Sequence, residues 1–247
     1  MRADQLLVDR GLASSRSQAQ RLIGSGVRWL ERGTWKTVAK NGDEVPAEAE
    51  IELLDLAEAR YVSRGGLKLE GALTTSGVDV RGKTCLDVGQ STGGFTDCLL
   101  QRGAARVVGV DVGSGQLHDK LRSDSRVTPV EKVNARELSA ADVGEDFDLV
   151  VGDLSFISST LVLPAVVPLL REGGDLLLLV KPQFELQPGQ VGKRGIVTDA
   201  SLYSVVEHRL RDCCAQLGLR IERWFDSPIA GGDGNREFFL HATKAVR

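Results

Sequence analysis

The chain divides near residue 60 into two parts with different patterns of apolar residues. In the first part, one-sided apolar positions predict two short helices, the first with Leu6, Leu7 and Leu12 on one side and the second ending near Ile23. Ser14 or Ser15 is expected to cap the second helix. Strands are then predicted at 27–30, 34–38 and 50–54, with turns at 31–33 and 41–42. This pattern predicts a small α+β domain over residues 1–58, followed by a linker at 59–62.

Beyond the linker, predicted strands alternate with predicted helices. Strands separated by helices indicate a mostly parallel sheet that is covered on both faces. The last two strands follow one another closely, which predicts an antiparallel edge. The fold class expected for residues 63–247 is therefore α/β with a Rossmann-like sheet. The strands are expected at 85–88, 106–110, 127–130, 148–151, 175–181, 220–226 and 237–243, and the helices at 66–76, 93–102, 116–123, 158–170 and 199–217.

One strand of this second part runs directly into a glycine-rich turn that opens a helix. Such a turn brings bare backbone N–H groups up against a nucleotide-like ligand. Asp111 ends the next strand, 22 positions after Gly89, where an acidic side chain can accept hydrogen bonds from ribose hydroxyls. The residues expected to form the ligand site around the turn are Asp87, Gly89, Ser91, Thr92, Gly93, Gly94 and Phe95.

The composition of the turn favours S-adenosylmethionine as the ligand. The turn reads Gly-x-Ser-x-Gly-Gly, whereas pyrophosphate binding is typical of Gly-x-Gly-x-x-Gly. We place Asp87 at the turn itself, where its carboxylate would repel a pyrophosphate and attract the ammonium group of S-adenosylmethionine. A dinucleotide is the second alternative. A tight turn without a ligand is the third, but it leaves Asp111 unexplained.

Four charged residues are predicted at one edge of the sheet, where open α/β sheets bind their ligands. Asp153 follows one strand, Lys181 ends a very apolar strand before Pro182, and Glu237 opens the last strand. Lys68 lies in the helix that precedes the first strand. A charged residue at a strand end is usually only solvated. Lys181 is harder to explain in that way, because five apolar residues lead into it, and it is therefore a candidate base for an alcohol.

Composition limits the partners and the compartment. Net charge is −3, so nucleic-acid binding requires a local basic patch. Residues 1–30 hold five arginines against two aspartates, and residues 43–58 hold seven acidic residues and no basic one. The arginines are either a phosphate-reading face, with the acidic stretch facing elsewhere, or a solvated helix surface. The four cysteines have no metal-ligand spacing and indicate buried thiols in a reducing compartment. No signal region and no membrane span is apparent, and a cytoplasmic protein without a metal is expected.

Six segments of the chain, in order, resemble the TlyA family of ribosomal RNA 2'-O-methyltransferases, some members of which are called hemolysin A. The resemblance implies a class I S-adenosylmethionine-dependent methyltransferase domain, and the first 60 residues resemble the alpha-L RNA-binding motif. The hairpin between Trp29 and Trp35 departs from the Val-Asn-Gly turn common in the family, which leaves its RNA contacts open. The matching segments are 63–69, 86–97, 109–113, 153–157, 180–185 and 234–238.

The resemblance also implies a function and further site residues. Similarity to the wider class of heat-shock and cell-division 2'-O-methyltransferases implies a catalytic tetrad of Lys68, Asp153, Lys181 and Glu237. The cofactor site would further include Val112, Asn134 and Asp153. Ribosomal RNA or a ribosomal subunit would be the partner, cytidine the favoured target, and a monomer the favoured state. The rival interpretations are a non-catalytic ribosome assembly factor and a membrane-active cytolysin. The residues expected to contact RNA are Arg2, Arg10, Arg16, Arg21, Arg64, Lys193 and Arg194, the last two on a glycine-flanked lid at 190–195.

Overall fold

The computed structural model describes residues 1–54 and 60–246 and divides the chain into two compact units, Met1–Leu67 and Lys68–Arg247. The expected domain boundary follows residue 58, and the expected linker begins at residue 59; both residues lie outside the described ones. Each unit has its own core, and each is described by itself.

The N-terminal unit is two helices on a small antiparallel sheet. Ser15 caps the second helix by accepting a hydrogen bond from the Gln18 backbone N–H, which confirms one of the two expected caps. The sheet order is β2-β1-β3. Leu6, Leu7 and Leu22 are among the apolar side chains buried between the helices and the sheet. The elements are α1 (Ala3–Asp9), α2 (Arg16–Gly26), β1 (Val27–Glu31), β2 (Thr34–Thr37) and β3 (Ile51–Leu53).

A buried carboxylate ties the helices of this unit together. Asp4 has no exposed surface, and it accepts two hydrogen bonds of 3.0 Å from Arg2 and one of 3.1 Å from Arg16. The hydrogen bonds from Arg2 hold the pKa of Asp4 well below its usual range. Asp4 is therefore a buried charge that is paired, as burial of a charge requires.

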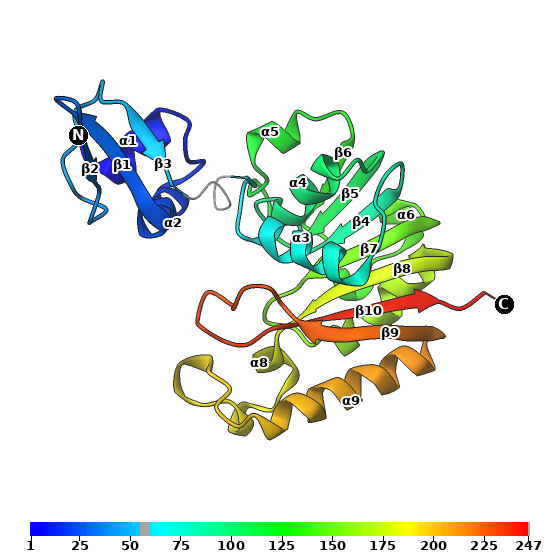
Figure 1. Cartoon of the computed structure of the whole chain (residues 1–247). Helices are drawn as coiled ribbons and strands as arrows, with labels where there is room; N and C mark the ends of the chain where they lie inside the picture. The colour runs from blue at the N-terminus through cyan, green and yellow to red at the C-terminus, as the bar shows by residue number, and fades with distance from the viewer. Residues whose placement is uncertain (55–59, 247) are drawn as a thin grey trace. The chain divides into compact units, whose positions relative to one another are not determined.

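The C-terminal unit is built on a seven-stranded sheet of order β6-β5-β4-β7-β8-β10-β9 (Figure 1). The first five strands in this order, β6, β5, β4, β7 and β8, run parallel to one another. Strand β10 pairs antiparallel with both β8 and β9. The Rossmann-like sheet and its antiparallel edge are thus confirmed. The strands are β4 (Thr84–Val88), β5 (Arg106–Asp111), β6 (Val127–Glu131), β7 (Phe147–Asp153), β8 (Leu170–Val180), β9 (Leu219–Asp226) and β10 (Phe238–Lys244).

Helices cover the sheet on both faces. Residues of α7 and α9 pack on one face in the main apolar cluster, and Phe95 of α4 stacks on Phe239 of β10 on the other. Figure 1 shows α9 running alongside the antiparallel edge. The α-helices are α3 (Gly65–Ser76), α4 (Gly94–Gln101), α5 (Asp119–Arg122), α6 (Ala140–Val143), α7 (Leu163–Val166), α8 (Pro182–Glu185) and α9 (Ser201–Gln216), and the 3-10 turns are η1 (Ala135–Glu137), η2 (Ser159–Leu161), η3 (Val167–Leu169), η4 (Pro188–Gln190) and η5 (Lys193–Gly195).

The single helix expected at 158–170 is wrong. The segment is divided into η2, α7 and η3, and a proline stands in the first turn of each of the last two. A proline has no N–H to continue a preceding helix, but it fits the first turn of a new one. The helix expected at 116–123 is likewise only the four residues of α5.

Candidate active site

A cavity of about 440 Å³ lies at the carboxyl ends of β4, β5 and β7. Strand β4 lies between the other two, so the chain leaves it in one direction to reach β5 and later returns on its other side as β7. This reversal of strand order is where open α/β sheets bind ligands. The residues that line the cavity are Gly89, Ser91, Val110, Asp111, Val112, Gln116, Val133, Asn134, Ala135, Asp153, Leu154, Ser155, Phe156 and Ile157.

Two glycines of the turn after β4 occupy positions that no other residue fits. Gly89 has φ +88°, and a Cβ placed there would lie 2.6 Å from the backbone oxygen of Asp153. Gly93 has φ +98°, and a Cβ there would lie 2.4 Å from Leu121 Cδ1. The turn thus passes close to the loop after β7, and its bare backbone forms one wall of the cavity.

Asp111 and its neighbours form the wall of the cavity that adjoins the turn. Its two carboxylate oxygens accept hydrogen bonds of 2.7 Å from the backbone N–H groups of Ser91 and Gly113. The carboxylate is therefore held at the cavity wall, where its remaining lone pairs can accept from a ribose diol. Val112 is 74% exposed beside it and Asn134 lines the same cavity. This donor and acceptor set, and the volume, fit S-adenosylmethionine.

Asp87 does not lie at the turn, and its carboxylate does not line the cavity. It is within β4, has no exposed surface, and accepts a 2.6 Å hydrogen bond from Thr96 Oγ1. The pKa of Asp87 is raised to about 7, mainly by burial; the bond from Thr96 opposes this rise, and the neighbouring Asp153 and Asp111 contribute to it. Its side chain supports the turn from within the sheet.

Several expected cofactor residues shape the turn and do not line the cavity. Thr92 and Gly93 lead into α4, and Gly94 is its first residue. Phe95 is buried against Phe239, with ring centroids 6.3 Å apart. Sequence reasoning missed other lining residues, of which Phe156 is 90% exposed with φ +64°. The resemblance covers the segment 153–157, but it assigns only Asp153 of that segment to the cofactor site. The residues missed are Val110, Gln116, Val133, Ala135, Leu154, Ser155, Phe156 and Ile157.

The four expected catalytic residues form two ion pairs. Lys181 Nζ lies 2.6 Å from Asp153 Oδ1 and donates a 2.8 Å hydrogen bond to Ser155 Oγ. Asp153 ends β7 and Lys181 follows β8 as the cap of α8, so two adjacent parallel strands deliver this pair. Because Asp153 and Ser155 line the cavity, the ammonium group of Lys181 is held at its wall.

The second pair is buried more deeply. Lys68 Nζ of α3 donates a 2.5 Å hydrogen bond to Glu237 Oε2, immediately before β10. Only 9% of the Lys68 side chain and 3% of the Glu237 side chain are exposed. A Cβ at Gly231 would lie 2.6 Å from Glu237 Oε1, so the loop before β10 closes tightly over the carboxylate. A buried pair of this kind holds its geometry, because separating the charges would leave both unsatisfied.

Glu185 links the two loops that carry the Asp153–Lys181 pair. This buried carboxylate, at the end of α8, accepts hydrogen bonds from Ser158 Oγ and, at 2.7 Å, from the Ser159 backbone N–H. Arg209 of α9 donates to the Glu185 backbone oxygen. The loop after β7 and the segment after β8 are therefore fastened to each other and to α9.

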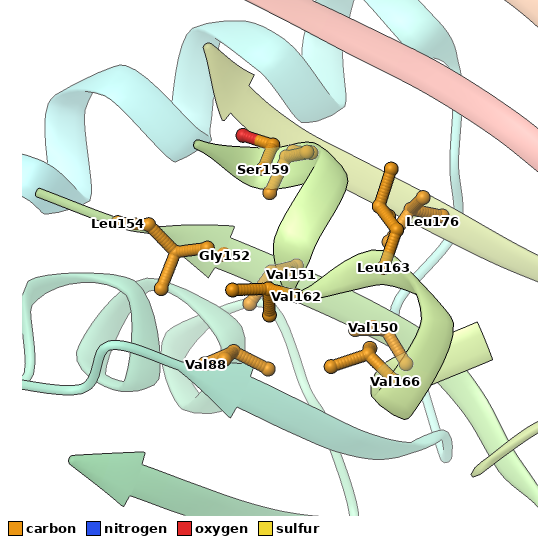
Figure 2. Close-up of a pocket in the computed structure, with 11 residues that line it drawn as sticks. Val88, Val150, Val151, Gly152, Leu154, Ser159, Val162, Leu163, Val166 and Leu176 are labelled. Carbon is orange, nitrogen blue, oxygen red and sulfur yellow. The ribbon is translucent and has the colours of Figure 1, made fainter. Parts of the chain in front are cut away.

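A small void lies behind the main cavity. It has a volume of about 10 Å³ and is lined by aliphatic side chains of β4, β7, β8 and α7, with Ser159 at its margin (Figure 2). Leu154 lines both this void and the main cavity. About one water molecule would fill such a volume, but an apolar lining offers that water no partners. The void is a small packing defect among β4, β7, β8 and α7.

All four N-terminal arginines expected to contact RNA make hydrogen bonds within their own unit. Arg2 and Arg16 hold Asp4, and Arg10 donates to the backbone oxygens of Ala47 and Ala49. The acidic stretch does not face wholly elsewhere, because Glu52 pairs with Arg28. Arg21 is on the exposed side of α2 and donates to the Ser17 backbone oxygen.

The other expected RNA-contacting residues lie outside the helices of the N-terminal unit. Arg64 immediately precedes α3, and Lys193 and Arg194 form η5, where Arg194 has φ +68°.

Among residues 1–54 and 60–246, no helix is long and apolar enough to cross a bilayer. Within the same residues, no group of three or more histidine, cysteine, aspartate or glutamate side chains is arranged to hold a metal ion. Cys85, Cys98 and Cys214 are buried as expected, whereas Cys213 is half-buried.

The sequence of this chain is similar to those of known proteins. Residues 61–244 match the FtsJ-like methyltransferase family. The chain is 44% identical over 239 residues to the 16S/23S rRNA (cytidine-2'-O)-methyltransferase TlyA of Mycobacterium tuberculosis, covering 97% of this chain and 88% of that protein. It is 38% identical over 247 residues to Hemolysin A of Brachyspira hyodysenteriae, covering 98% and 99% of the two chains.

Solved structures give the same result at the level of the fold. A candidate hemolysin from Streptococcus thermophilus superposes with a TM-score of 0.77 at 39% identity, covering 99% of this chain and 88% of that one. An S-adenosylmethionine-dependent methyltransferase from Mesorhizobium loti superposes with a TM-score of 0.53 at 16% identity, covering 71% and 97%. At that identity the second likeness shows the fold alone.

Proposed function

Because this chain belongs to the FtsJ-like methyltransferase family and is an S-adenosylmethionine-dependent enzyme, we propose that it methylates a ribose 2'-hydroxyl of ribosomal RNA, with cytidine as the target nucleoside. The observation that carries the proposal is the position of Lys181. Asp153 and Ser155 hold its ammonium group at the wall of the cavity that fits the cofactor.

The cofactor is assigned to the cavity beside the turn after β4. Gly89 and Ser91 provide the close backbone wall, Asp111 accepts from the ribose, and Val112 and Asn134 flank the adenine. Bound S-adenosylmethionine supplies an electrophilic methyl group on a sulfonium, which is already a good leaving group. The protein therefore has mainly to position the accepting hydroxyl.

The four charged residues are assigned to that positioning. Lys181 orients the 2'-hydroxyl, and as the neutral amine it takes the hydroxyl proton at Nζ and becomes an ammonium as the oxygen bonds to the methyl group. Asp153 and Ser155 fix the direction of the Lys181 side chain, since both contact Nζ. Lys68, held by Glu237 in a buried pair, adds a fixed positive charge that stabilises the developing oxyanion.

The RNA-binding role is assigned to the domain at residues 1–58, with Arg64, Lys193 and Arg194 contributing from the rest of the chain. Arg2, Arg10, Arg16 and Arg21 are proposed to contact phosphates with the guanidinium surface that their internal bonds leave exposed. The Arg2 side chain is 47% exposed and the Arg16 side chain 61% exposed. Folded RNA is recognised mainly through its shape and backbone, which suits such a set. Binding through phosphates should weaken steeply as salt rises. A cytoplasmic monomer is proposed.

Mapping of 2'-O-methyl groups in ribosomal RNA tests the proposal. RNA from cells that lack the protein should lose a methyl group, and purified protein should restore it in a single-turnover reaction with ribosomal particles and S-adenosylmethionine. Binding to particles without any methyl transfer would favour an assembly factor. Leakage from liposomes that persists in a Lys181→Ala variant, without methyl transfer by the wild type, would favour a cytolysin.

A further inference from the structure

The β1–β2 hairpin of the N-terminal unit presents an aromatic side chain that the fold does not use. Every residue of β2 is exposed, and Trp35 at its centre is 36% exposed. Trp29, across the same hairpin, is by contrast buried in the core. A single exposed apolar side chain is normal on a protein surface, so a role for Trp35 has to be argued from its surroundings.

The register of the hairpin puts Trp35 on the outer face of the sheet. Trp35 is directly opposite Leu30, and Lys36 is opposite Trp29. Residues directly opposite in an antiparallel pair share a face, so Trp35 lies on the face away from the buried Trp29. Trp35 therefore points away from the core, and packing of the domain does not explain it.

The ring of Trp35 is held in a fixed orientation. The guanidinium carbon of Arg28 lies over it, 4.8 Å from the ring centroid. Arg28 is itself fixed by its ion pair with Glu52 on β3. A guanidinium on the ring and a carboxylate on the guanidinium lower the entropy lost when a second planar group binds, because the ring is already ordered.

The charge around the hairpin fits an anionic partner with planar groups. Residues 27–40 hold Arg28, Arg32, Lys36 and Lys40 against the single acid Glu31. Arg32 lies in the turn with φ +49° and is exposed, at the tip of the hairpin. Nucleic acid supplies both a planar base and nearby phosphates, and bases stack on aromatic rings in this way.

From these features we propose that Trp35 is a stacking platform for an unpaired nucleobase of the RNA substrate, with the exposed Arg32 at the hairpin tip on a flanking phosphate. The inference deepens the proposed function and rests on it. It also names a substrate class: an RNA with a bulged or looped-out base near the N-terminal unit. A continuous duplex keeps its bases stacked inside and offers Trp35 nothing to bind.

Two short RNA hairpins that differ only by one unpaired purine test this inference on the full-length protein. Wild type should prefer the bulged RNA. Trp35→Ala should lose roughly 5- to 100-fold of its affinity for that RNA and bind the two equally. Trp35→Phe should retain most of the preference, since a ring remains. Thr37→Ala, an exposed change on the same strand, should bind as wild type, and all variants should bind S-adenosylmethionine equally.

A parallel assay of methyl transfer to ribosomal particles separates the two ideas. If wild type transfers methyl groups and Trp35→Ala has wild-type affinity for both hairpins, the stacking platform is overturned and the proposed function stands. If Trp35→Ala loses affinity for intact particles but for neither RNA, a ribosomal protein covers Trp35 and the inference is again overturned. If wild type neither binds nor methylates particles, the proposed function fails and the inference fails with it.

Discussion

The two units bury an aspartate in opposite ways. Asp4 in the N-terminal unit is surrounded by donors, with Arg2 and Arg16 contributing positive charge, and its pKa is held well below the usual range. Asp87 in the sheet receives a hydroxyl from Thr96 and lies near other carboxylates, and its pKa is raised to about 7. The same side chain is therefore a charged link between helices in one unit and, in the other, a buried support that takes up a proton near neutral pH.

This contrast extends to the other charges of each unit. In the N-terminal unit, the charges of Arg2, Arg10 and Arg16 are engaged in holding the small domain together. In the C-terminal unit, the Asp153–Lys181 pair stands at a cavity, and Asp87 lies behind it. The charged side chains named here stabilise the fold of the first unit, whereas those of the second are proposed to act in the reaction. The predictions below test this difference.

The largest effect is expected at Lys181. Lys181→Ala should lower the rate of methyl transfer roughly 10²- to 10⁴-fold, the usual contribution of a proton-transfer group, with little change in melting temperature. Lys181→Arg should be equally inactive, because arginine keeps its proton. Single-turnover rates, with the exposed Lys120→Ala as control, measure this. A fast Lys181→Arg enzyme would show that the position supplies charge alone.

The next effect concerns Asp87 and pH. Because the folded state raises its pKa, the native protein binds the proton more tightly than the unfolded chain, and this contribution to stability is lost as pH rises from about 4 to about 7. Between pH 5 and pH 8, Asp87→Asn should therefore gain about 2–3 kcal/mol relative to wild type. Urea unfolding at both values measures this, with the exposed Asp119→Asn as control. Parallel pH profiles for variant and wild type would contradict it.

Asp4 should respond to pH in the opposite direction. Its lowered pKa contributes stability that is present above about pH 4 and is lost as acid protonates the folded carboxylate. At neutral pH, Asp4→Asn should destabilise the N-terminal unit by about 2 kcal/mol, the cost of losing hydrogen bonds to a charged group. Proteolysis within residues 1–54, compared with the exposed Asp9→Asn, reports this. Equal resistance of the two variants would mean that Asp4 does not hold the helices.

The smallest effect should come from Arg16. Arg16→Gln leaves Arg2 on Asp4, and its own side chain is largely exposed, so the loss of stability should be under about 1 kcal/mol. The same variant should lose more free energy of RNA binding than of folding. Its RNA affinity, measured at two salt concentrations, should depend less steeply on salt than that of the wild type. Loss of stability without loss of RNA affinity would restrict Arg16 to holding the fold.

The fold could be predicted because its signals are local. Apolar strands separated by helices, and two closely spaced final strands, led to the Rossmann-like sheet with an antiparallel edge, and the family comparison confirms the methyltransferase class and its cofactor. The broken segment at 158–170 was missed because its apolar residues are continuous. Pro164 and Pro168 stand in first turns, where they begin new helices.

The site could be predicted in part. The turn after β4 and Asp111 were recognisable, since a strand, a turn and the next strand lie close together in the sequence. The burial of Asp87 within β4 was not recognisable, because the pattern of apolar residues does not show whether a residue ends a strand or lies inside it. The wall formed by Ser155 and Phe156 depends on a loop with positive φ at Phe156, and the partners of Arg2 and Arg16 depend on how two helices meet.

Glu185 has a consequence for how the active site moves. One buried carboxylate accepts from Ser158 and Ser159, so the loop after β7 can open away from the segment after β8 only when both hydrogen bonds break. The Ser159 amide donates a 2.7 Å hydrogen bond to Glu185, so hydrogen exchange at this amide reports such opening. Its rate of exchange with deuterated solvent should match that of neighbouring amides in the same opening event. Replacing Glu185 with glutamine should quicken that exchange while the central strands remain protected.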